Sequence, residues 1–430
     1  MILSSLLLLT PMAATPPVVA VQGDFFAIKA RRVELGDGEV MEHAVILIEN
    51  GEIVTMGQDL PIARGIPVIE LDDDQVVMPG IVNPYTRLGM SGGGYSDARP
   101  QVMASAEIYP SKAYETFLEF GITTIAQYPA GQGIPGQAVA LRPEGDTAEE
   151  MTIEDGVYLK AVMRNNSSAK RNLSGGFKKA DAYLEKVEKE REKFEKKNSK
   201  KSSSKKSTTK KSDDKKEEGK DEKKTTTKSS AKSKKAVFVP PKPDPRVQPF
   251  LDLRSGKLRA LFSISNAASF VHLIDAIDEE EFEWHLRVPL TRDINIFHVK
   301  EEIGELECFV LMEPLITLVP GTMRQRNLPA EFDRAGAKLV LIPRRDSEAG
   351  FKAFLNDVGV MISAGLDRGA AVRAITQNAA AFLGLDEQVG SLAEGRRANL
   401  VIYSGDPFQP GTKIDAVMLD GRFVSGDIDQ

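Results

Sequence analysis

The sequence predicts an α/β protein: a TIM-type (β/α)8 barrel, complete or incomplete because an insert interrupts it, joined to a small β-sandwich domain that both chain ends build. Two observations lead to this prediction. In the middle of the chain, short apolar runs alternate with helical stretches, whereas at both ends short apolar runs are separated by tight turns. The 430 residues, 41% of them hydrophobic, exclude wholesale disorder and a small disulfide framework. An open doubly wound sheet is the alternative architecture.

The chain opens with an apolar run from Ile2 to Leu9, which Pro and small residues follow. This run is too short for a membrane-spanning helix, which needs about 20 residues, and it fits the apolar region of a secretory signal. We therefore expect residues 1–20 to be a signal peptide and the protein to be exported to a bacterial periplasm. Because no positive charge precedes the run, a mis-assigned start and a lipid-facing anchor stay open. No other stretch is long and apolar enough to span a membrane.

The composite β domain is expected from residues 22–78 and 390–428. In VILIENGEIVTMG, apolar residues alternate on both sides of Asn50-Gly51, a pair that tolerates the positive φ of a two-residue hairpin turn. Asp420-Gly421 repeats this pattern near the C-terminus. Since an isolated hairpin is marginal in water, we expect these two distant hairpins to join one domain.

The barrel is expected from residues 79–185 and 237–389. Its candidate strands are the apolar runs VVMPGIV, GITTIAQY, LRALFSIS, INIFHV, FVLMEPL and AKLVLIP, and its clearest helices are PSKAYETFLEF and RGAAVRAITQNAAAFLG. Strands that alternate with helices favour parallel pairing with helical crossovers. The glycines of SGGGYSD have neither a P-loop lysine nor the dinucleotide-binding spacing, so we expect only a flexible loop there.

Residues 186–236 are expected to lie outside the folded core, as the end of a charged helix and a disordered insert. From Lys196 to Lys235 there are 17 Lys and 6 acidic residues, a net charge of +11, whereas the whole chain carries −6 and the remainder therefore −17. No large apolar side chain offsets the entropy of ordering this stretch. We interpret it as a solvated spacer. The alternative is a tether to an anionic surface or polymer, without specific nucleic-acid recognition, because no aromatic residue is present for base stacking.

Four segments, in this order, resemble the amidohydrolase superfamily, especially its imidazolonepropionase-like branch. NGEIVTMG with DDDQVVMPGIVNPYTRLG is similar to the hairpin and first barrel strand of that family, and FLEFGITTI to its second strand. AVRAITQNAAAFLGL resembles the last barrel helix, with Asn378-Ala379-Ala380 where the family often has Asn-Pro-Ala. VGSLAEGRRANLVIYSGDPF resembles the return into the β domain. The likeness is loose between Gly156 and Ala337.

The resemblance implies a hydrolase of carbon–nitrogen bonds other than peptide bonds, in which one or two divalent metals activate water at the C-terminal mouth of the barrel. It also implies a His-x-His pair at the end of the first strand, where this sequence has Tyr85 and Arg87. A guanidinium is not deprotonated in proteins and repels a dication. We therefore expect a degenerate site without a cofactor, and zinc only if these positions are misassigned.

The resemblance points to three further positions, one of which is altered. Ser265 or Asn266 stands where the fifth strand would supply a histidine. His298, at the end of the expected strand INIFHV, is the one histidine in a suitable place. Because a lone imidazole gives a transition metal little affinity, we expect no metal there, and a remnant ligand is the alternative. Lys160 lies where some family members carboxylate a lysine, although we expect an ordinary ion pair at this strand end.

Asp346 matches the general base that the family carries after its last barrel strand. Arg344 and Arg345 directly precede it and favour a paired carboxylate. The remaining candidates are interpreted as structural or surface groups: His43 in the β domain, His272 on a helix, His285 in a charged helix, and Cys308 as a buried thiol.

Three functions remain open from the sequence. The first is a hydrolase with a non-standard site and Asp346 as its base. The second, which we favour, is a barrel that has lost or altered its metal catalysis and binds a small anion at its mouth. In this version Arg87, Arg344 and Arg345 converge, with Tyr85 and Asn266 beside them. The third is a barrel carrier that the basic insert tethers to an anionic surface. Substrate and oligomeric state stay open.

Overall fold

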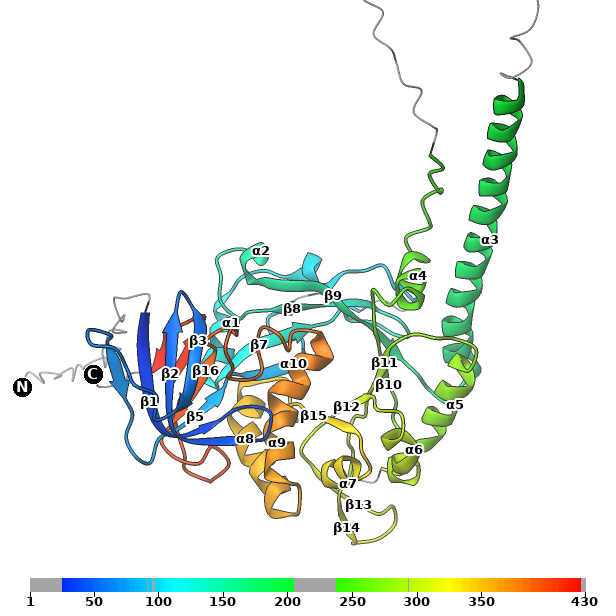
Figure 1. Cartoon of the computed structure of the whole chain (residues 1–430). Helices are drawn as coiled ribbons and strands as arrows, with labels where there is room; N and C mark the ends of the chain where they lie inside the picture. Colours follow the sequence, from blue (N-terminus) through cyan, green and yellow to red (C-terminus); the bar gives the residue numbers. More distant parts are fainter. Residues whose placement is uncertain (1–24, 91, 95–96, 205–236, 293, 427–430) are drawn as a thin grey trace, which may run out of the picture.

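The computed structural model describes residues 25–426 except 91, 95–96, 205–236 and 293. The expected signal peptide and most of the Lys-rich insert lie outside the described residues. Within the described part, no helix is both long and apolar enough to span a membrane. Figure 1 shows a β domain on one side, a curled sheet with helices on the other, and one long helix that extends away from both.

The β domain is one continuous eight-stranded sheet that both chain ends build, rather than two separate sheets. Its strand order is β18-β17-β16-β5-β1-β2-β3, with β4 paired to β1. The strands are β1 (Phe25–Glu34), β2 (Val40–Glu49), β3 (Glu52–Gln58), β4 (Val68–Glu70), β5 (Val76–Pro79), β16 (Leu400–Tyr403), β17 (Ile414–Leu419) and β18 (Arg422–Gly426). The antiparallel pairing of β16 with β5 joins the two ends.

Both predicted hairpin turns are confirmed by their backbone angles. Asn50 and Gly51 have φ values of 52° and 85°, and Asp420 and Gly421 have 47° and 74°. All four lie in the left-handed region, which Asn, Asp and Gly tolerate best. The first turn connects β2 to β3 and the second connects β17 to β18.

The second sheet confirms the barrel prediction in its incomplete form. Its eight strands follow the order β15-β12-β11-β10-β9-β8-β7-β6. They are β6 (Ile81–Thr86), β7 (Ile122–Gln127), β8 (Gly136–Leu141), β9 (Thr152–Val162), β10 (Ala260–Ser263), β11 (Trp284–Arg287), β12 (Phe309–Met312) and β15 (Lys338–Leu341). All neighbours are parallel except β8, which is antiparallel to β7 and β9. No backbone pairing joins β6 to β15 among the described strands, so the sheet is open at this seam.

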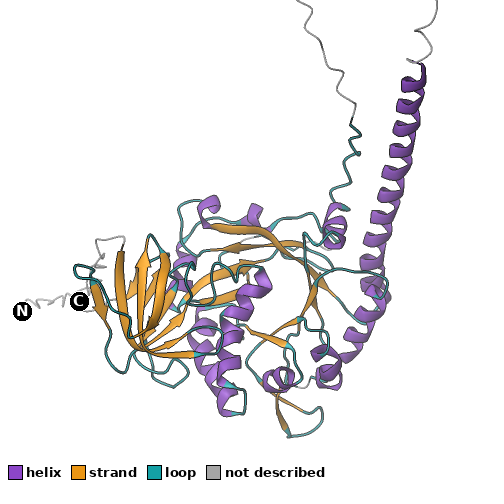
Figure 2. Cartoon of the chain, viewed as in Figure 1, coloured by secondary structure: helices purple, strands orange, loops and turns teal. Residues whose placement is uncertain are grey.

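The remaining elements are mainly helices. They are α1 (Lys112–Glu119), α2 (Ala148–Met151), α3 (Ser167–Ser204), α4 (Gln248–Arg254), α5 (Ala267–Ile277), α6 (Lys300–Gly304), α7 (Leu328–Arg334), α8 (Glu348–Ser363), α9 (Arg368–Ile375) and α10 (Gln377–Leu383), with 3-10 turns η1 (Ala104–Glu107) and η2 (Ile296–Val299) and a hairpin of β13 (Ile316–Leu318) and β14 (Gln325–Asn327). Figure 2 shows these helices outside the curled sheet, except α10, which lies against its open side.

Helix α10 fills the seam between β6 and β15. It packs against both strands. Asn378 donates a hydrogen bond from Nδ2 to the carbonyl of Leu339 at 2.9 Å, which satisfies an edge carbonyl of β15 that no strand covers. Phe382 lies inside the sheet, with its ring centroid 5.2 Å from that of Tyr158 and 5.3 Å from that of His285. The barrel interior is therefore packed rather than hollow at this end.

The charged helix is confirmed as α3, which continues to Ser204, past the expected beginning of the disordered insert. Its first turns bury Leu173, Phe177 and Ala180 against the body. Farther out, Glu–Lys and Arg–Glu pairs four residues apart line it, such as Lys189 with Glu185 at 3.4 Å. Figure 1 shows this outer part extending away from the sheets.

Two local predictions are wrong. The run INIFHV is not a strand but the 3-10 turn η2, because its apolar residues do not join the sheet. The segment around Trp284 and His285 is not a charged helix but strand β11, in which His285 is buried. The acidic residues before it had suggested a helix, yet β11 sits in the middle of the sheet, where tertiary pairing overrides local composition.

Candidate functional site

Polar and aromatic side chains gather where the barrel strands end. Alternate residues of a strand point to the same face, so Tyr158 and Lys160 of β9 and His285 and Arg287 of β11 share the barrel interior. We define the mouth cluster as the residues at the carboxyl ends of the strands that interact with one another: Tyr85, Arg87, Tyr128, Lys160, Arg287, Glu313 and Asp346.

Lys160 is a buried cation whose contacts are aromatic. It is 8% exposed, and its Nζ lies 3.6 Å from the ring centroid of Tyr128 and 5.1 Å from that of Tyr85. No carboxylate among the described residues forms an ion pair with it, so the expected strand-end ion pair is wrong. Burial, followed by the charges of Arg87 and Arg287, lowers the pKa of Lys160 to about 7. The amine is therefore partly neutral at neutral pH.

Arg287 and Glu313 form a buried ion pair in the same cluster. Arg287 is 5% exposed and donates through Nη1 and Nη2 to the two carboxylate oxygens of Glu313. Glu313 also accepts a hydrogen bond from the backbone N–H of Leu290 at 2.8 Å. The guanidinium carbon of Arg287 lies 5.2 Å from the ring centroid of Tyr85. Its Nε is buried and has no hydrogen-bond partner among the described residues.

Asp346 closes the seam at the mouth. Its Oδ1 accepts from the hydroxyl of Thr86, and its Oδ2 accepts from the backbone N–H of Arg87 at 2.6 Å. The carboxylate thus links the end of β15 to the end of β6, although no backbone pairing is described between these strands. Asp346 itself is exposed. The residue that the resemblance indicated as a base therefore lies at the mouth, where its carboxylate accepts hydrogen bonds from the end of β6.

The tyrosines form one wall of the mouth. Tyr85 and Tyr128 stack with ring centroids 4.1 Å apart. Tyr158 lies deeper and donates its hydroxyl to the carbonyl of Pro84 at 3.1 Å. Burial raises the pKa of all three phenols, so they stay neutral over the physiological range. Tyr85 faces the interior, where it contacts Tyr128 and Lys160.

Arg87 lies at the rim of the mouth, and its guanidinium is held by backbone carbonyls. Nη1 donates to the carbonyl of Tyr128 at 2.5 Å and Nη2 to that of Gly92 at 2.9 Å, with Glu107 4.0 Å away. The cations in the barrel interior are Lys160, which the sequence suggested only as an ordinary ion pair, and Arg287, which the sequence did not suggest. Alternation in GVYLKAV and in WHLR was the signal that could have identified them.

The predicted convergence of arginines does not occur. Arg344 is exposed and pairs with Asp357 of α8 at 3.6 Å, whereas Arg87 contacts the end of β7. Arg345 is exposed and has no described contact with the mouth cluster. Asn266 is the N-cap of α5, and its Oδ1 accepts from the backbone N–H of Ser269 at 2.9 Å. This side chain is thus occupied by helix capping.

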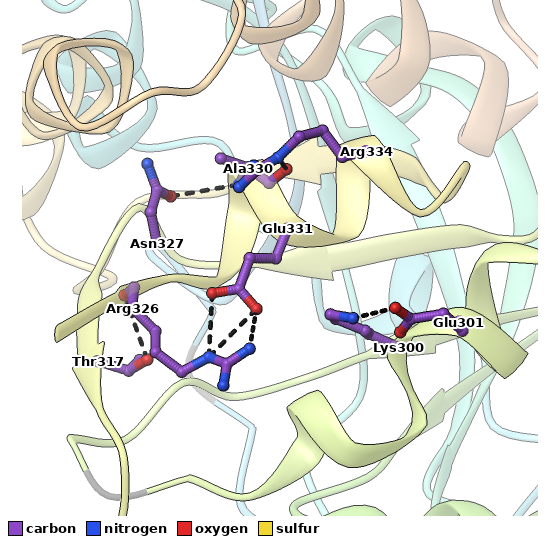
Figure 3. A network of polar contacts seen from close by, with 8 residues as sticks. All are labelled: Lys300, Glu301, Thr317, Arg326, Asn327, Ala330, Glu331 and Arg334. Carbon is purple, nitrogen blue, oxygen red and sulfur yellow. Dashed lines mark hydrogen bonds and ion pairs between the residues drawn. The ribbon is translucent and has the colours of Figure 1, made fainter. Parts of the chain in front are cut away.

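His298 does not lie at a strand end. It is exposed in η2, with its ring centroid 4.2 Å from that of Phe297. Figure 3 shows the neighbouring polar network, in which Arg326 pairs with Glu331 and Asn327 caps α7 through the N–H of Ala330. These contacts fix the β13–β14 hairpin to α7, so the network is a structural one.

The donor set of the mouth does not fit a divalent metal. Its interior groups are two cations, neutral phenols and a carboxylate that Arg287 already neutralises. The structure, over its described residues, gathers no three His, Cys, Asp or Glu side chains that could hold a metal ion. Zinc prefers imidazole, thiolate and carboxylate ligands, so the described residues of the mouth do not suit it.

The geometry defines a class of protein: a (β/α) barrel with a site at the carboxyl ends of its strands and a β domain that both chain ends build. Residues 328–425 match a family model described as "Amidohydrolase family". This match covers 98 of the 430 residues, from α7 to the last strand of the β domain, and the solved structures below share the fold of the whole chain. No curated protein matches the sequence.

An amidohydrolase from Thermotoga maritima MSB8 is 18% identical, with a TM-score of 0.67 over 94% of this chain and 100% of its own. A β-aspartyl dipeptidase from Fervidobacterium islandicum AW-1, solved in complex with a β-Asp-Leu dipeptide, is 12% identical, with a TM-score of 0.50 over 95% and 98% of the two chains. A molinate hydrolase is 14% identical, with a TM-score of 0.50 over 94% and 95%. At these identities the likeness is one of fold.

Proposed function

We propose that this protein descends from hydrolases of non-peptide carbon–nitrogen bonds, that its metal-dependent catalysis is lost or altered, and that its barrel mouth binds a small anionic ligand. One observation carries the proposal: Lys160 is a buried ammonium without a carboxylate partner among the described residues. Burying an unpaired charge is costly. A ligand carboxylate at the mouth supplies the missing counter-charge and stabilises the charged amine.

Arg287 and the tyrosines support the same assignment. The unpartnered Nε of Arg287 is a second donor, and a guanidinium suits planar oxyanions. Tyr85 and Tyr128 offer stacked apolar faces for the uncharged part of a ligand. The exposed Asp346 at the opening disfavours a second negative charge on the outer part of that ligand. The mouth therefore suits a monoanion with a compact, partly apolar body.

Calorimetric titration tests this proposal with N-acetylglycinate, a small carboxylate that contains one carbon–nitrogen amide bond. Its methyl ester, which lacks the charge, is the control compound. We expect the carboxylate to bind and the ester not to bind, and we expect Lys160→Met to weaken binding by about tenfold or more, since a charged hydrogen bond is worth about 1.5–3 kcal/mol. Lys338→Met, at the opposite end of the barrel, is the matched control. Equal affinity for acid and ester contradicts the proposal.

A second candidate is a metal-independent hydrolase in which neutral Lys160 acts as general base. The observation that favours it is the lowered pKa of Lys160, about 7, which matches the pKa that suits a base at neutral pH. Release of glycine from N-acetylglycinate that survives a chelator and is lost in Lys160→Met supports this candidate. Release that stops on chelation and returns with zinc supports a metal-dependent hydrolase instead.

The tether hypothesis concerns residues 196–235, most of which lie outside the described residues. It stays a separate proposal, in which the net charge of +11 binds an anionic surface. Binding to anionic vesicles that falls steeply with salt, and that disappears when residues 205–236 are deleted, tests it.

A further inference from the structure

We propose that the cleft between the barrel helices and the β domain is a second ligand site, independent of the mouth. The geometry points to a compact, mostly apolar molecule with a neutral hydrogen-bond acceptor at its inner end and a carboxylate at its outer end. Three features of this cleft carry the proposal: its shape and lining, a buried hydroxyl without a partner, and two lysines at its rim.

The cleft has a volume of about 430 Å³. One wall comes from α1 and α8, where Phe120 and Phe351 lie with ring centroids 6.5 Å apart and Leu355 extends the apolar surface. The other wall comes from the β domain, from the end of β16 and the loop that leads to β17. A cavity of this size with aromatic walls suits a small ring-bearing molecule.

Tyr403, the last residue of β16, marks the inner end of the cleft. It lines the cleft but is 1% exposed, and its hydroxyl is buried with no hydrogen-bond partner among the described residues. Buried hydroxyls nearly always have a partner. Since burial raises the pKa of Tyr403, the phenol stays protonated and is a donor for a neutral acceptor such as a carbonyl oxygen.

Lys352 and Lys413 mark the outer end. Both line the cleft and are exposed, the first on α8 and the second directly before β17. Neither forms an ion pair with a described residue, so both are free to attract an anion. An ammonium on each side of the opening favours a carboxylate there, while the inner end accepts only an uncharged group because a desolvated charge is costly.

Titration calorimetry of the full-length protein tests the site with 4-acetylbenzoate, which carries a carbonyl at one end of a ring and a carboxylate at the other. The comparison compound is 4-isopropylbenzoate, of similar shape but without the carbonyl. We expect Tyr403→Phe to weaken binding of 4-acetylbenzoate about tenfold and to leave 4-isopropylbenzoate unchanged. The double variant Lys352→Met/Lys413→Met is expected to bind both compounds more weakly than the wild type. The control is Tyr109→Phe, at an exposed tyrosine outside the cleft, and it is expected to leave the affinity for both compounds unchanged.

A second measurement separates binding from folding. Because Tyr403→Phe removes no hydrogen bond of the described structure, its midpoint of thermal unfolding is expected to equal or exceed that of the wild type. A fall in this midpoint shows that the hydroxyl has a partner within the protein and overturns the proposal. Absent binding of 4-acetylbenzoate, or equal affinity in wild type and Tyr403→Phe, overturns it as well. Lys160→Met leaves this binding intact, which distinguishes the cleft from the mouth.

Discussion

The ammonium of Lys160 lies 3.6 Å from the centroid of the Tyr128 ring, in the interior of the barrel and without a carboxylate partner among the described residues. A ring face attracts a cation but neutralises no charge. The site is therefore arranged around a cation that the protein only partly stabilises, and we expect this cation to lower the stability of the fold and, under the proposed function, to attract anions.

The first prediction concerns the stability of Lys160→Met. The pKa of Lys160 is about 7 in the folded protein, below the ordinary 10.5, so the unfolded chain binds the proton more tightly. The charged Lys160 therefore lowers the free energy of unfolding by its full amount below about pH 7. This loss of stability becomes smaller as the pH rises from 7 toward 10.5. We expect Lys160→Met to raise the free energy of unfolding at pH 7 by at most about 5 kcal/mol. Urea unfolding of the wild type and Lys160→Met at pH 6.5 and 9.5 measures this difference. A gain in the free energy of unfolding that is equal at the two pH values contradicts the prediction.

The second prediction is the pH dependence of anion binding at the mouth. A carboxylate binds the protonated form of Lys160, so affinity for N-acetylglycinate is expected to be constant below about pH 7 and to fall about tenfold per pH unit above it. Titrations between pH 6 and 9 in two buffers of different ionisation enthalpy measure both the affinity and the proton uptake. In Lys160→Met the profile should be flat. A wild-type profile that is flat as well argues against Lys160 as the anion contact.

The third prediction concerns the buried pair of Arg287 and Glu313. Removing one partner leaves an uncompensated buried charge, so Arg287→Met and Glu313→Leu should each lower the free energy of unfolding by about 3–5 kcal/mol. The double variant should lose less than the sum, because it leaves no unpaired charge. A double-mutant cycle by urea denaturation measures this coupling. The pair Lys189→Met and Glu185→Leu, exposed on α3, is the control and should change stability by less than about 1 kcal/mol.

The fourth prediction is the metal content. Because the mouth offers cations and phenols where a metal needs anionic or imidazole donors, protein purified without added ions should contain well under one equivalent of zinc, iron or manganese. Elemental analysis by mass spectrometry checks this. If the protein instead holds one equivalent tightly, and Asp346→Asn or Glu313→Gln removes it, the mouth rearranges to bind metal. That result favours a metal-dependent hydrolase.

The overall architecture could be predicted from the sequence because its signals are local. Asn50-Gly51 and Asp420-Gly421 specify tight turns by their own backbone preferences, and the apolar runs of β7, β12 and β15 are long enough to stand out. The weakest signals belonged to β11, where His285 and Arg287 are inward-facing residues of a short strand. Alternation over the four residues of WHLR is too short to separate a strand from a helix, and the burial of these residues depends on their neighbours in the folded sheet.

The site was harder to predict, for a related reason. Tyr85 and Asp346 were placed at the mouth by the resemblance, yet the contacts of Asp346 with Thr86 and Arg87 depend on how far the sheet curls. Arg344 was expected to bind an anion, but its side chain leaves the loop toward Asp357 on α8. The direction of a side chain in a loop depends on tertiary contacts that adjacency in sequence does not reveal.

The seam between β6 and β15 has a mechanical consequence. In a closed barrel every strand pairs with the next, whereas here the described edges of β6 and β15 are joined by the Asp346 carboxylate at the mouth and by the helices α9 and α10. A small separation of β6 from β15 would break the hydrogen bonds of Asp346 and helix contacts, but no backbone pairing described between the two strands. The width of the mouth on this side is therefore set by side-chain contacts and helix packing rather than by a backbone ladder.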